Sequence, residues 1–478
     1  MPSAPSGTVA VPHPSGARAA PARPLREQPV ALAELAWPAR AALAAALVLS
    51  LFVAMWNAAH YPGFLGFDAN HHFDYAQQLL HTGSIPSQAE GGEWYTPPGF
   101  YALAAAALWI GQQLHLHDHG LRAVLYLDGL TTFATTLVVL ALARLLAPRR
   151  PTVRIAAVGF MALAPIVATS GAMFHPEPLN MLLSAAAILV MARMLVNRSY
   201  PIRTLIVLAV LLGADQLVRS SSLFTFATIG ITLLVVLLAR SGSRRGKLRN
   251  LAITVLLIAA VASPWYGYEL ATYHTVRLGG FTYWYLHPAG PAEGGASLGI
   301  PSGTTIRAMA DHPYRPNFTN EAFPTFYTDL WGDWYGVFSW SSYSQGPWNK
   351  AAAVMRDQQW IGILPTGLAL AGFVGFWWAV LRRRRLELLP LALLPAIALP
   401  VFFYRAYALP NSIGDMLKPI YVLTTAPVWA LAFAFAYDRL GFNRLARYSL
   451  LAAFLILAVY DLRFVLYGIR DHNVILWA

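Results

Sequence analysis

The sequence predicts an all-α membrane protein with about eleven spanning helices, and three observations support this fold class. Of the 478 residues, 57% are hydrophobic and only 12% are charged, about half the charged fraction of a soluble domain. Apolar runs of about 18 to 24 residues recur along the chain, which is the length that a helix needs to cross a bilayer. Arginines gather in the short segments between these runs, where they set the orientation of each span.

The composition also narrows the functional classes. The first 36 residues are rich in Pro, Ala and Arg, and we expect a disordered cytoplasmic tail there. The apolar run at about 38–58 is too long and too far from the N-terminus for a cleaved signal peptide, so it is expected to remain as the first helix.

The sequence has no cysteine, which excludes disulfides and thiolate chemistry. The net charge of +12 is spread over loops, so nucleic-acid binding is not expected.

The basic loops fix the predicted topology because Lys and Arg near a span stay cytoplasmic. If both 97–114 and 122–146 crossed the membrane, the basic loop at 144–154 and every later one would face outward. If 97–114 instead lies on the membrane surface, all of these basic loops face the cytoplasm. The predicted spans are about 38–58, 122–146, 153–173, 178–197, 202–219, 222–240, 249–267, 359–381, 386–405, 415–437 and 445–466.

This topology places the N-terminus in the cytoplasm and the C-terminus outside. The expected organisation is a tail at 1–36, a transmembrane module at 37–267 with a first outer loop at 59–121, a large outer loop at 268–358, and C-terminal helices at 359–478. The outer face then carries most of the unusual polar residues of the chain.

Acidic and histidine residues meet on that face. Asp68 and His72 follow the first span, and His175 and Glu177 lie between the third and fourth. Asp68 alone is explained as a helix N-cap, and Glu177 as a first-turn acid that suits the helix dipole. Two acids at the water–lipid boundary also suit a general base and its orienting partner for an acceptor hydroxyl. The spacing alone leaves both interpretations open.

The histidines favour hydrogen bonding over metal binding. His72 lies four residues after Asp68, so on a helix the two side chains share a face, and His175 lies beside Glu177. Their spacing matches no standard zinc pattern. A divalent metal stays the alternative interpretation.

Three cations lie at outer span ends, against the positive-inside tendency. Lysine is rare in this chain, yet Lys418 begins an apolar span on the outside, while Arg219 and Arg405 end two others. Each one alone is explained by a side chain that snorkels to the interface. Three such exceptions on one surface favour the binding of a lipid phosphate or diphosphate.

The long outer loop is rich in aromatic residues, at 281–288 and 326–343. Trp and Tyr mark any membrane interface, and their rings also stack on sugar faces, so a carbohydrate acceptor is the second interpretation. No Gly-rich phosphate-binding loop occurs in a strand-to-helix context, so a nucleotide-driven enzyme is not expected. A lipid-linked donor fits this absence because its energy is carried in the phosphate ester.

Two neighbouring segments of the first outer loop form a longer motif. They read FDANHHFDYAQQLLHTGSIP and EWYTPPGFYALAAAAL. These segments resemble the first outer loop of the GT-C superfamily of integral-membrane glycosyltransferases, especially the protein O-mannosyltransferases and the aminoarabinose transferase of lipid A. Asp68, His72 and Tyr75 match the acid, histidine and tyrosine of that loop, and Pro97 and Pro98 match its paired prolines. The family architecture implies two juxtamembrane helices after the first span.

Later segments extend the resemblance over about residues 40–440. Glu177 matches the second acid of the family, Arg219 the basic residue after the fifth span, and Lys418 with Tyr421 the late segment whose basic residue contacts the donor phosphate. The chain departs from the pattern at Ala69, where many members have a second carboxylate. That role passes to Asp74, to Glu93 or to no residue. Pro419 and Ile420 replace a small residue and an arginine, which removes one phosphate contact.

The resemblance implies an inverting transferase that takes a sugar from a polyprenyl-phosphate donor on the extracytoplasmic face of the plasma membrane. Asp68 would be the base, assisted by Glu177 and His72. Lys418, with Arg219 or Arg405, would bind the donor phosphate. The candidates for acceptor or sugar binding are Asp74, Glu93, Tyr95, His175 and Tyr421.

No cofactor is implied, and the expected partners are the lipid-linked donor, an unidentified extracytoplasmic acceptor and the bilayer. Three alternatives remain open on the sequence. A lipid-diphosphate-dependent oligosaccharide transferase or polymerase would more often need a divalent metal. A transporter would show inverted repeats and broken helices near the middle of the membrane. An inactive scaffold would keep the fold and lose the chemistry.

Overall fold

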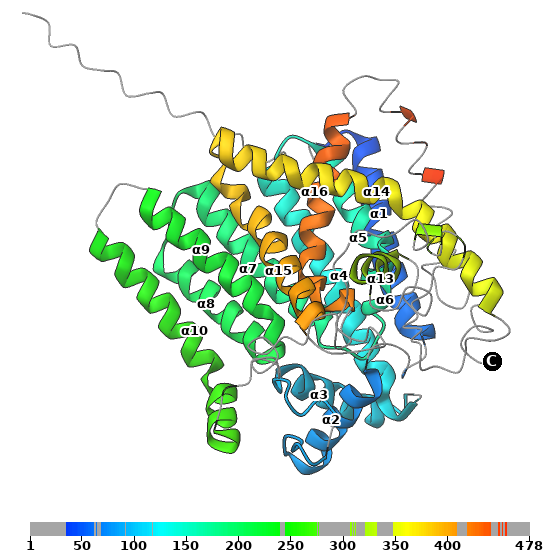
Figure 1. Ribbon diagram of the computed structural model, residues 1–478, viewed down its shortest axis with the longest axis vertical. Coiled ribbons are helices and arrows are strands. Elements are labelled where there is room, and N and C mark those ends of the chain that lie inside the picture. The colour runs from blue at the N-terminus through cyan, green and yellow to red at the C-terminus, as the bar shows by residue number, and fades with distance from the viewer. Residues whose placement is uncertain are drawn as a thin grey trace, which may run out of the picture.

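The computed structural model describes residues 35–61, 64, 68–90, 92–116, 118–239, 244–274, 276, 321–331, 348–408 and 418–440, with isolated residues between 306 and 311 and between 448 and 456. These ranges are mostly helical (Figure 1). The first ten α-helices are α1 (Trp37–His60), α2 (Ala69–Thr82), α3 (Gly99–Gln113), α4 (Leu121–Leu146), α5 (Pro151–Leu163), α6 (Pro165–Ser170), α7 (Glu177–Asn197), α8 (Ile202–Val218), α9 (Leu223–Ala239) and α10 (Arg244–Tyr273). The later elements are α13 (Ala322–Trp331), α14 (Trp348–Arg383), the 3₁₀ helix η7 (Leu386–Leu388), α15 (Leu389–Ala408), the 3₁₀ helix η8 (Pro419–Thr425) and α16 (Ala426–Leu440).

Seven helical segments in the described part of the chain are long and apolar enough to cross a membrane. They coincide with the predicted first, second, fourth, seventh, eighth, ninth and tenth spans. The chain is therefore a multi-pass helical membrane protein. The fifth and sixth predicted spans correspond to α8 and α9, each of 17 residues. The predicted eleventh span, 445–466, lies outside the described residues apart from single positions.

The predicted third span, 153–173, is divided in the structure. α5 ends at Leu163 and α6 begins at Pro165. Proline has no amide hydrogen to continue the helical ladder, and it disfavours helical geometry at the residue before it. The 13 residues of α5 extend about 20 Å, which is less than the apolar core of about 30 Å in a bilayer.

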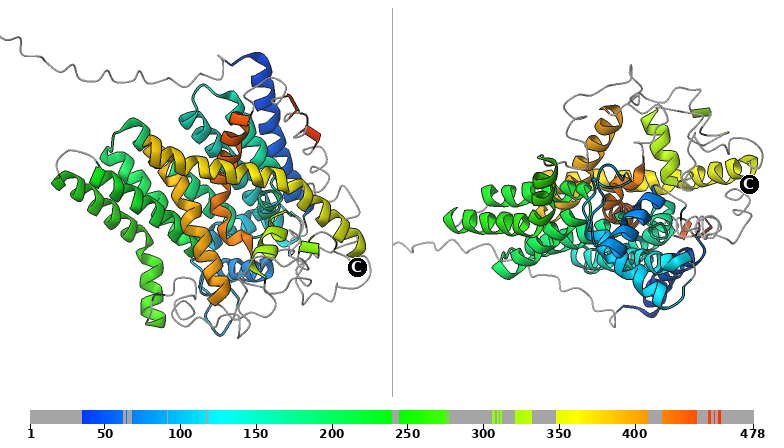
Figure 2. Two further views of the ribbon diagram at one scale, coloured as in Figure 1. Left: turned by 45° about the horizontal axis from the view of Figure 1, so that its top comes forward. Right: turned by 90° about the horizontal axis from the view of Figure 1, so that it is seen from below.

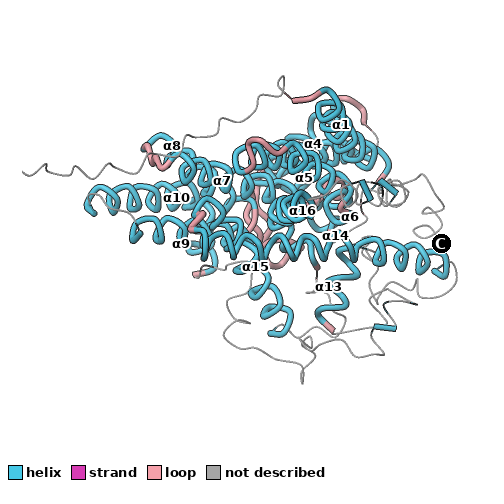
Figure 3. Tube along the Cα trace, turned by 90° about the horizontal axis from the view of Figure 1, so that it is seen from above, coloured by secondary structure: helices cyan, strands magenta, loops and turns pink. Residues whose placement is uncertain are grey.

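The helices form one bundle, with different helices at its two edges. α8, α9 and α10 lie side by side at one edge, and α1 lies at the opposite edge (Figures 1 and 3). α14 has 36 residues, about 54 Å of helix, and it runs obliquely across α16 (Figure 2). Within it, Arg356–Arg383 is the part apolar enough to cross a membrane.

α14 and α16 approach each other closely at a glycine. A Cβ atom at Gly372 would overlap the backbone carbonyl of Ala432. Only a residue without a side chain permits this helix crossing, because a backbone carbonyl has no rotamer by which to move away. The contact ties the oblique α14 to the buried α16.

α2 and α3 lie together at one end of the bundle (Figure 1), at the two positions where juxtamembrane helices are expected. The buried residues of α2 recur at i, i+3, i+6 and i+7, along one face of an amphipathic helix, and they are Ala69, His72, Tyr75 and Ala76. The ring of Tyr75 stacks on that of Tyr101 in α3, with a centroid separation of 3.8 Å. This packing fixes α2 against α3 and turns His72 toward the bundle.

Candidate functional site

Asp68 and Lys418 form an ion pair that joins the two ends of the chain. The Lys418 Nζ donates a hydrogen bond of 2.7 Å to Asp68 Oδ2 across 350 residues of sequence. The lysine side chain is 2% exposed and the aspartate side chain 30% exposed. Asp68 occupies the N-cap position of α2, yet its side chain makes no capping hydrogen bond. The Asp68 carboxylate therefore pairs with Lys418 instead of capping the helix, and the N-cap interpretation is wrong for the Asp68 side chain.

The backbone of Asp68 has a special conformation. Its φ of 59° lies in the left-handed region, which Asn and Asp occupy more readily than other residues with a Cβ. This conformation ends the connection from α1 and begins α2. The local geometry therefore holds the carboxylate at the mouth of the cluster.

Three cations surround the ring of Tyr421 in η8. The guanidinium carbon of Arg405 lies 4.5 Å from the ring centroid, that of Arg219 lies 5.7 Å away, and Lys418 Nζ lies 5.9 Å away. All three distances are within the about 6 Å over which cations are attracted to an aromatic face. Cations that repel one another are thus gathered at one place.

Arg219 forms a buried bridge between two carboxylates. Its Nε lies 3.0 Å from Glu177 Oε1, and its Nη1 lies 3.4 Å from Glu93 Oε2. Glu177 also accepts hydrogen bonds from Asn180 Nδ2 at 2.6 Å and Ser221 Oγ at 3.4 Å. The first turn of α7, the end of α8 and the 83–98 connection are held together by this network.

A layer of histidine and tyrosine lies behind Asp68. His72 Nδ1 lies 2.7 Å from the Tyr101 hydroxyl, and the rings of His72 and His175 meet edge to face at 4.5 Å. The backbone N–H of Glu177 donates to His175 Nδ1 at 3.3 Å, so the proton of a neutral His175 lies on Nε2. Thr96 Oγ1 donates toward the Tyr101 hydroxyl at 2.9 Å and completes the layer.

The surroundings shift the pKa values of these groups in opposite directions. Burial alone would raise the pKa of Asp68, but the charge and hydrogen bond of Lys418 lower it below the usual value. Burial raises the pKa of Glu93 in spite of Arg219. Burial, with the nearby Arg219, lowers the pKa of His72 well below its usual value. At neutral pH, Asp68 is therefore ionised and His72 is neutral.

The structure brings together all but one of the site residues predicted from the sequence. Tyr95 joins through its hydroxyl, which donates to Glu93 Oε1 at 3.1 Å. Asp74 differs, because it is exposed. It lies two residues from His72, about 200° around the helix, so it faces away from the buried side of α2. The roles assigned to the clustered residues stay predictions.

Sequence reasoning missed the supporting residues Thr96, Tyr101, Asn180 and Ser221. Tyr101 follows the paired prolines of the TPPGFY segment, and Asn180 lies one helical turn after Glu177. The i, i+3 spacing of Glu177 and Asn180 would have indicated the hydrogen bond between them. No such local spacing indicates the contact between Tyr101 and His72.

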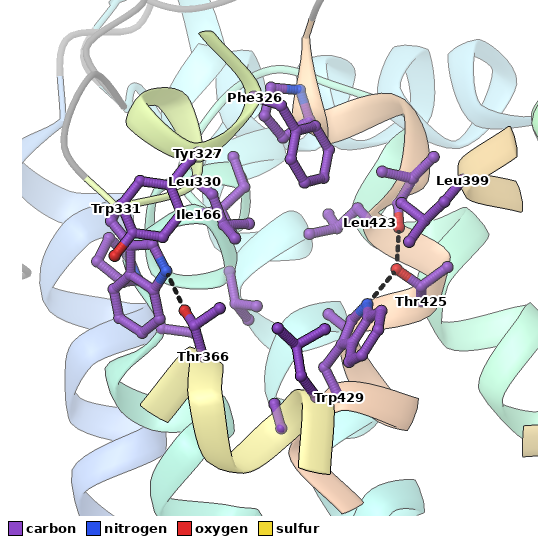
Figure 4. A pocket seen from close by; sticks show the side chains of 18 of the residues that line it. Ile166, Phe326, Tyr327, Leu330, Trp331, Thr366, Leu399, Leu423, Thr425 and Trp429 are labelled. Atoms are coloured by element: carbon purple, nitrogen blue, oxygen red, sulfur yellow. Dashed lines mark hydrogen bonds between the residues drawn. The ribbon is translucent and has the colours of Figure 1, made fainter. Parts of the chain in front are cut away.

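An apolar cavity of about 270 Å³ lies on the other side of η8 (Figure 4). Its walls come from α5, α6, α13, α14, α15, η8 and α16. The polar groups of the wall have partners: Trp331 Nε1 donates to Thr366 Oγ1 at 2.9 Å, Trp429 Nε1 donates to Thr425 Oγ1 at 3.0 Å, and the Tyr327 hydroxyl donates to the Gln359 carbonyl at 2.8 Å. The lumen therefore offers a hydrocarbon surface. A cavity of about 150 Å³ with such walls is large enough to bind benzene.

Among the described residues, no group of three or more His, Asp or Glu side chains is arranged to hold a metal ion. The two clustered histidines contact each other and Tyr101 rather than a shared centre. The aromatic segment 281–288 and most of 326–343 lie outside the described residues, and 326–331 forms the end of α13.

No protein-family model and no curated protein sequence matches this chain. The structure is similar to the archaeal oligosaccharyltransferase AglB from Archaeoglobus fulgidus, solved with an inhibitory peptide and a dolichol-phosphate, with 13% identity, a TM-score of 0.49 and coverage of 90% of this chain and 55% of that one. A second structure of the Archaeoglobus fulgidus enzyme, with Zn and sulfate, has 15% identity, a TM-score of 0.48 and coverage of 89% and 52%.

The structure is also similar to ArnT from Cupriavidus metallidurans bound to undecaprenyl phosphate, with 15% identity, a TM-score of 0.48 and coverage of 87% of this chain and 63% of that one. The chain thus spans about half to three-fifths of the length of these neighbours. ArnT is an aminoarabinose transferase, one of the groups that the sequence motifs resemble.

Proposed function

We propose that this protein is a membrane glycosyltransferase that moves a sugar from a polyprenyl-phosphate donor to an acceptor hydroxyl on the extracytoplasmic face, with inversion. The ion pair between Asp68 and Lys418 carries the proposal. It places a carboxylate that can accept a proton beside a cation that can receive a phosphate. The pair also adjoins an apolar cavity through η8.

The donor fits this arrangement because it combines an anionic head with an apolar chain. Lys418 and Arg405, both close to Tyr421, offer positive charge to the phosphate. Pro419, Val422 and Leu423 of the same 3₁₀ helix line the cavity that would take the first isoprene units. Arg219 contacts two carboxylates, so its proposed role changes from phosphate binding to holding Glu93 and Glu177 in place.

In the proposed reaction, an acceptor oxygen attacks the anomeric carbon from the face opposite the phosphate. The carbon–oxygen bond to the phosphate breaks, and its electron pair leaves on the polyprenyl phosphate. The acceptor proton passes to Asp68. Lys418 and Arg405 stabilise the negative charge that develops on the leaving phosphate.

The resting ion pair implies an order of binding. Lys418 is the main cause that lowers the pKa of Asp68, whereas burial acts in the opposite direction. When the donor phosphate attracts Lys418, the pKa of Asp68 rises and the carboxylate becomes a stronger base. Donor binding therefore prepares the base, and the donor is expected to bind before the acceptor.

The experiment uses purified protein in liposomes with a panel of radiolabelled polyprenyl-phosphate sugars and measures release of the lipid phosphate. We expect Asp68→Asn to abolish release, because the amide cannot accept the proton, while the left-handed backbone suits Asn equally well. Glu90→Gln is the matched control, since Glu90 is exposed in the same outer loop. Unchanged turnover in Asp68→Asn would disprove the assignment of the base.

A chelator separates this proposal from the diphosphate alternative. Release of the lipid phosphate that persists in the presence of the chelator supports the monophosphate donor. Release that occurs only from polyprenyl-diphosphate sugars, tested in parallel, and that requires an added divalent cation would support a lipid-diphosphate-dependent transferase instead. No release from any donor, with membrane insertion verified, would contradict the proposed reaction.

A further inference from the structure

A second cavity, of about 200 Å³, lies between α14 and α16 at the end of the bundle opposite the polar cluster. η8 begins beside Lys418 and α16 ends at Leu440. Seven 3₁₀ residues and 15 α-helical residues together extend about 36 Å, which matches the thickness of a bilayer core of about 30 Å. The second cavity is therefore at the opposite membrane surface, which the basic loops predict to be cytoplasmic.

The floor of this cavity is apolar and its rim is basic. Phe376, Leu388 and Phe435 contribute to the floor, and Arg385 and Arg439 lie at the rim. Gly375 leaves room for the side chain of Arg439, because a Cβ atom at this position would come within 3.2 Å of Arg439 Nη1. The guanidinium group therefore extends over the groove between the two helices.

The charges around the rim do not cancel. Arg382, Arg383 and Arg384 precede Arg385 and are exposed. The nearby acids are engaged: Glu387 Oε1 lies 2.8 Å from Arg385 Nε, and Asp438 Oδ2 lies 2.7 Å from Arg150 Nη1. Among the described residues, Arg439 has no acidic partner within ion-pair distance. The rim therefore carries an excess of positive charge beside an apolar floor.

We propose that this groove binds one anionic phospholipid of the cytoplasmic leaflet, with its phosphate at Arg385 and Arg439 and an acyl chain along Gly375 and Phe435. Basic pockets between transmembrane helices at the cytoplasmic side bind anionic lipid head groups, and each basic residue contributes to the attraction. The guanidinium fork suits a phosphate. The lipid would fill the space that the close crossing at Gly372 opens between α14 and α16. This inference does not depend on the proposed enzymatic function.

The test measures lipid retained by the full-length protein in native mass spectrometry, with phosphatidylglycerol and phosphatidylcholine of identical acyl chains. We expect one phosphatidylglycerol to remain bound under conditions that remove phosphatidylcholine. Arg439→Gln is expected to weaken phosphatidylglycerol binding about fivefold. Arg439→Lys keeps the charge but loses the fork, so it is expected to weaken binding less than Arg439→Gln does. Arg193→Gln, at an exposed arginine of α7, is the control and should leave binding unchanged.

Gly375→Leu provides a second variant. It keeps every charged residue, but its side chain fills the groove and meets the Arg439 guanidinium, so it should reduce phosphatidylglycerol binding even though Arg439 remains. Glycerol 1-phosphate, which lacks acyl chains, should not compete. Equal retention of the two lipids, unchanged binding in both Arg439→Gln and Gly375→Leu, or full competition by glycerol 1-phosphate would each overturn the inference.

Discussion

Replacement of Arg219 tests the architecture of the polar cluster without knowledge of any substrate. The side chains of Arg219, Glu177 and Glu93 are 11%, 0% and 7% exposed, and the two ion-pair distances are 3.0 and 3.4 Å. Removing one partner of a buried pair costs about 3–5 kcal/mol, because the remaining charge loses its compensation. We expect Arg219→Gln to lower the free energy of unfolding by about this amount at pH 8.

The size of this loss depends on pH through Glu93. Burial already raises the pKa of Glu93, and Arg219 opposes that rise. Without Arg219 the folded-state pKa moves further up, so over an interval of pH the folded protein holds a proton that the unfolded chain releases. The destabilisation is smallest below the folded-state pKa of Glu93 in the wild type, and it grows by up to about 1.4 kcal/mol per pH unit until the folded-state pKa of Glu93 in the variant is passed.

The assay follows tryptophan fluorescence during denaturant unfolding in mixed micelles at pH 5 and pH 8. Arg203→Gln is the matched control, because Arg203 is exposed on the same helix, and its effect should stay within about 0.5 kcal/mol. Adding Glu177→Gln to Arg219→Gln should recover part of the stability. A loss below about 1 kcal/mol for Arg219→Gln, or a loss equal at both pH values, would refute the reasoning.

Two further replacements test other contacts. Gly372→Ala should destabilise the protein by about 1–3 kcal/mol, because its Cβ meets the Ala432 carbonyl, whereas Gly367→Ala on the same helix meets open space and should be neutral or stabilising by up to about 1 kcal/mol. Thermal unfolding of the pair checks this, and equal effects would contradict the close crossing. Tyr421→Leu should raise the KM for the donor about 5- to 30-fold through lost attraction to the cations, while Tyr421→Phe keeps the ring and should stay near wild type. Equal KM values for these two variants would assign the effect to the hydroxyl instead.

The sequence predicts the long apolar helices well because their signal is local. Composition within about 20 residues decides whether a helix can span a bilayer. The prediction is less accurate where a single residue changes the path of the chain, as at Pro165 between α5 and α6. α8 and α9 are also shorter than ordinary spans, so their length alone does not decide whether they cross the membrane, and packing against longer helices contributes.

The candidate site could be predicted as a set of residues but not as a set of contacts. Polar groups at outer span ends are visible in the sequence because they are exceptions in an apolar chain. Their pairing requires the fold: Lys418 meets Asp68 across 350 residues, and Arg219 meets Glu93 across 126. For that reason the sequence assigned Arg219 to the donor phosphate and kept Asp74 as a candidate, whereas the structure engages the first with carboxylates and exposes the second.

The broken helical geometry of η8 explains how one short segment serves both a polar cluster and an apolar cavity. The sequence predicts a continuous span over 415–437, but residues 419–425 form a 3₁₀ segment that begins at Pro419 and is kinked at Val422, whose φ of −118° and ψ of 20° are not helical. Before the kink, the ring of Tyr421 lies among the three cations of the cluster. From the kink onward, Val422, Leu423 and Thr425 line the cavity. In a continuous α-helix, Val422 would lie only about 40° from Lys418, and the two surfaces would merge. The kink keeps a charged face for a phosphate separate from an apolar face for its chain.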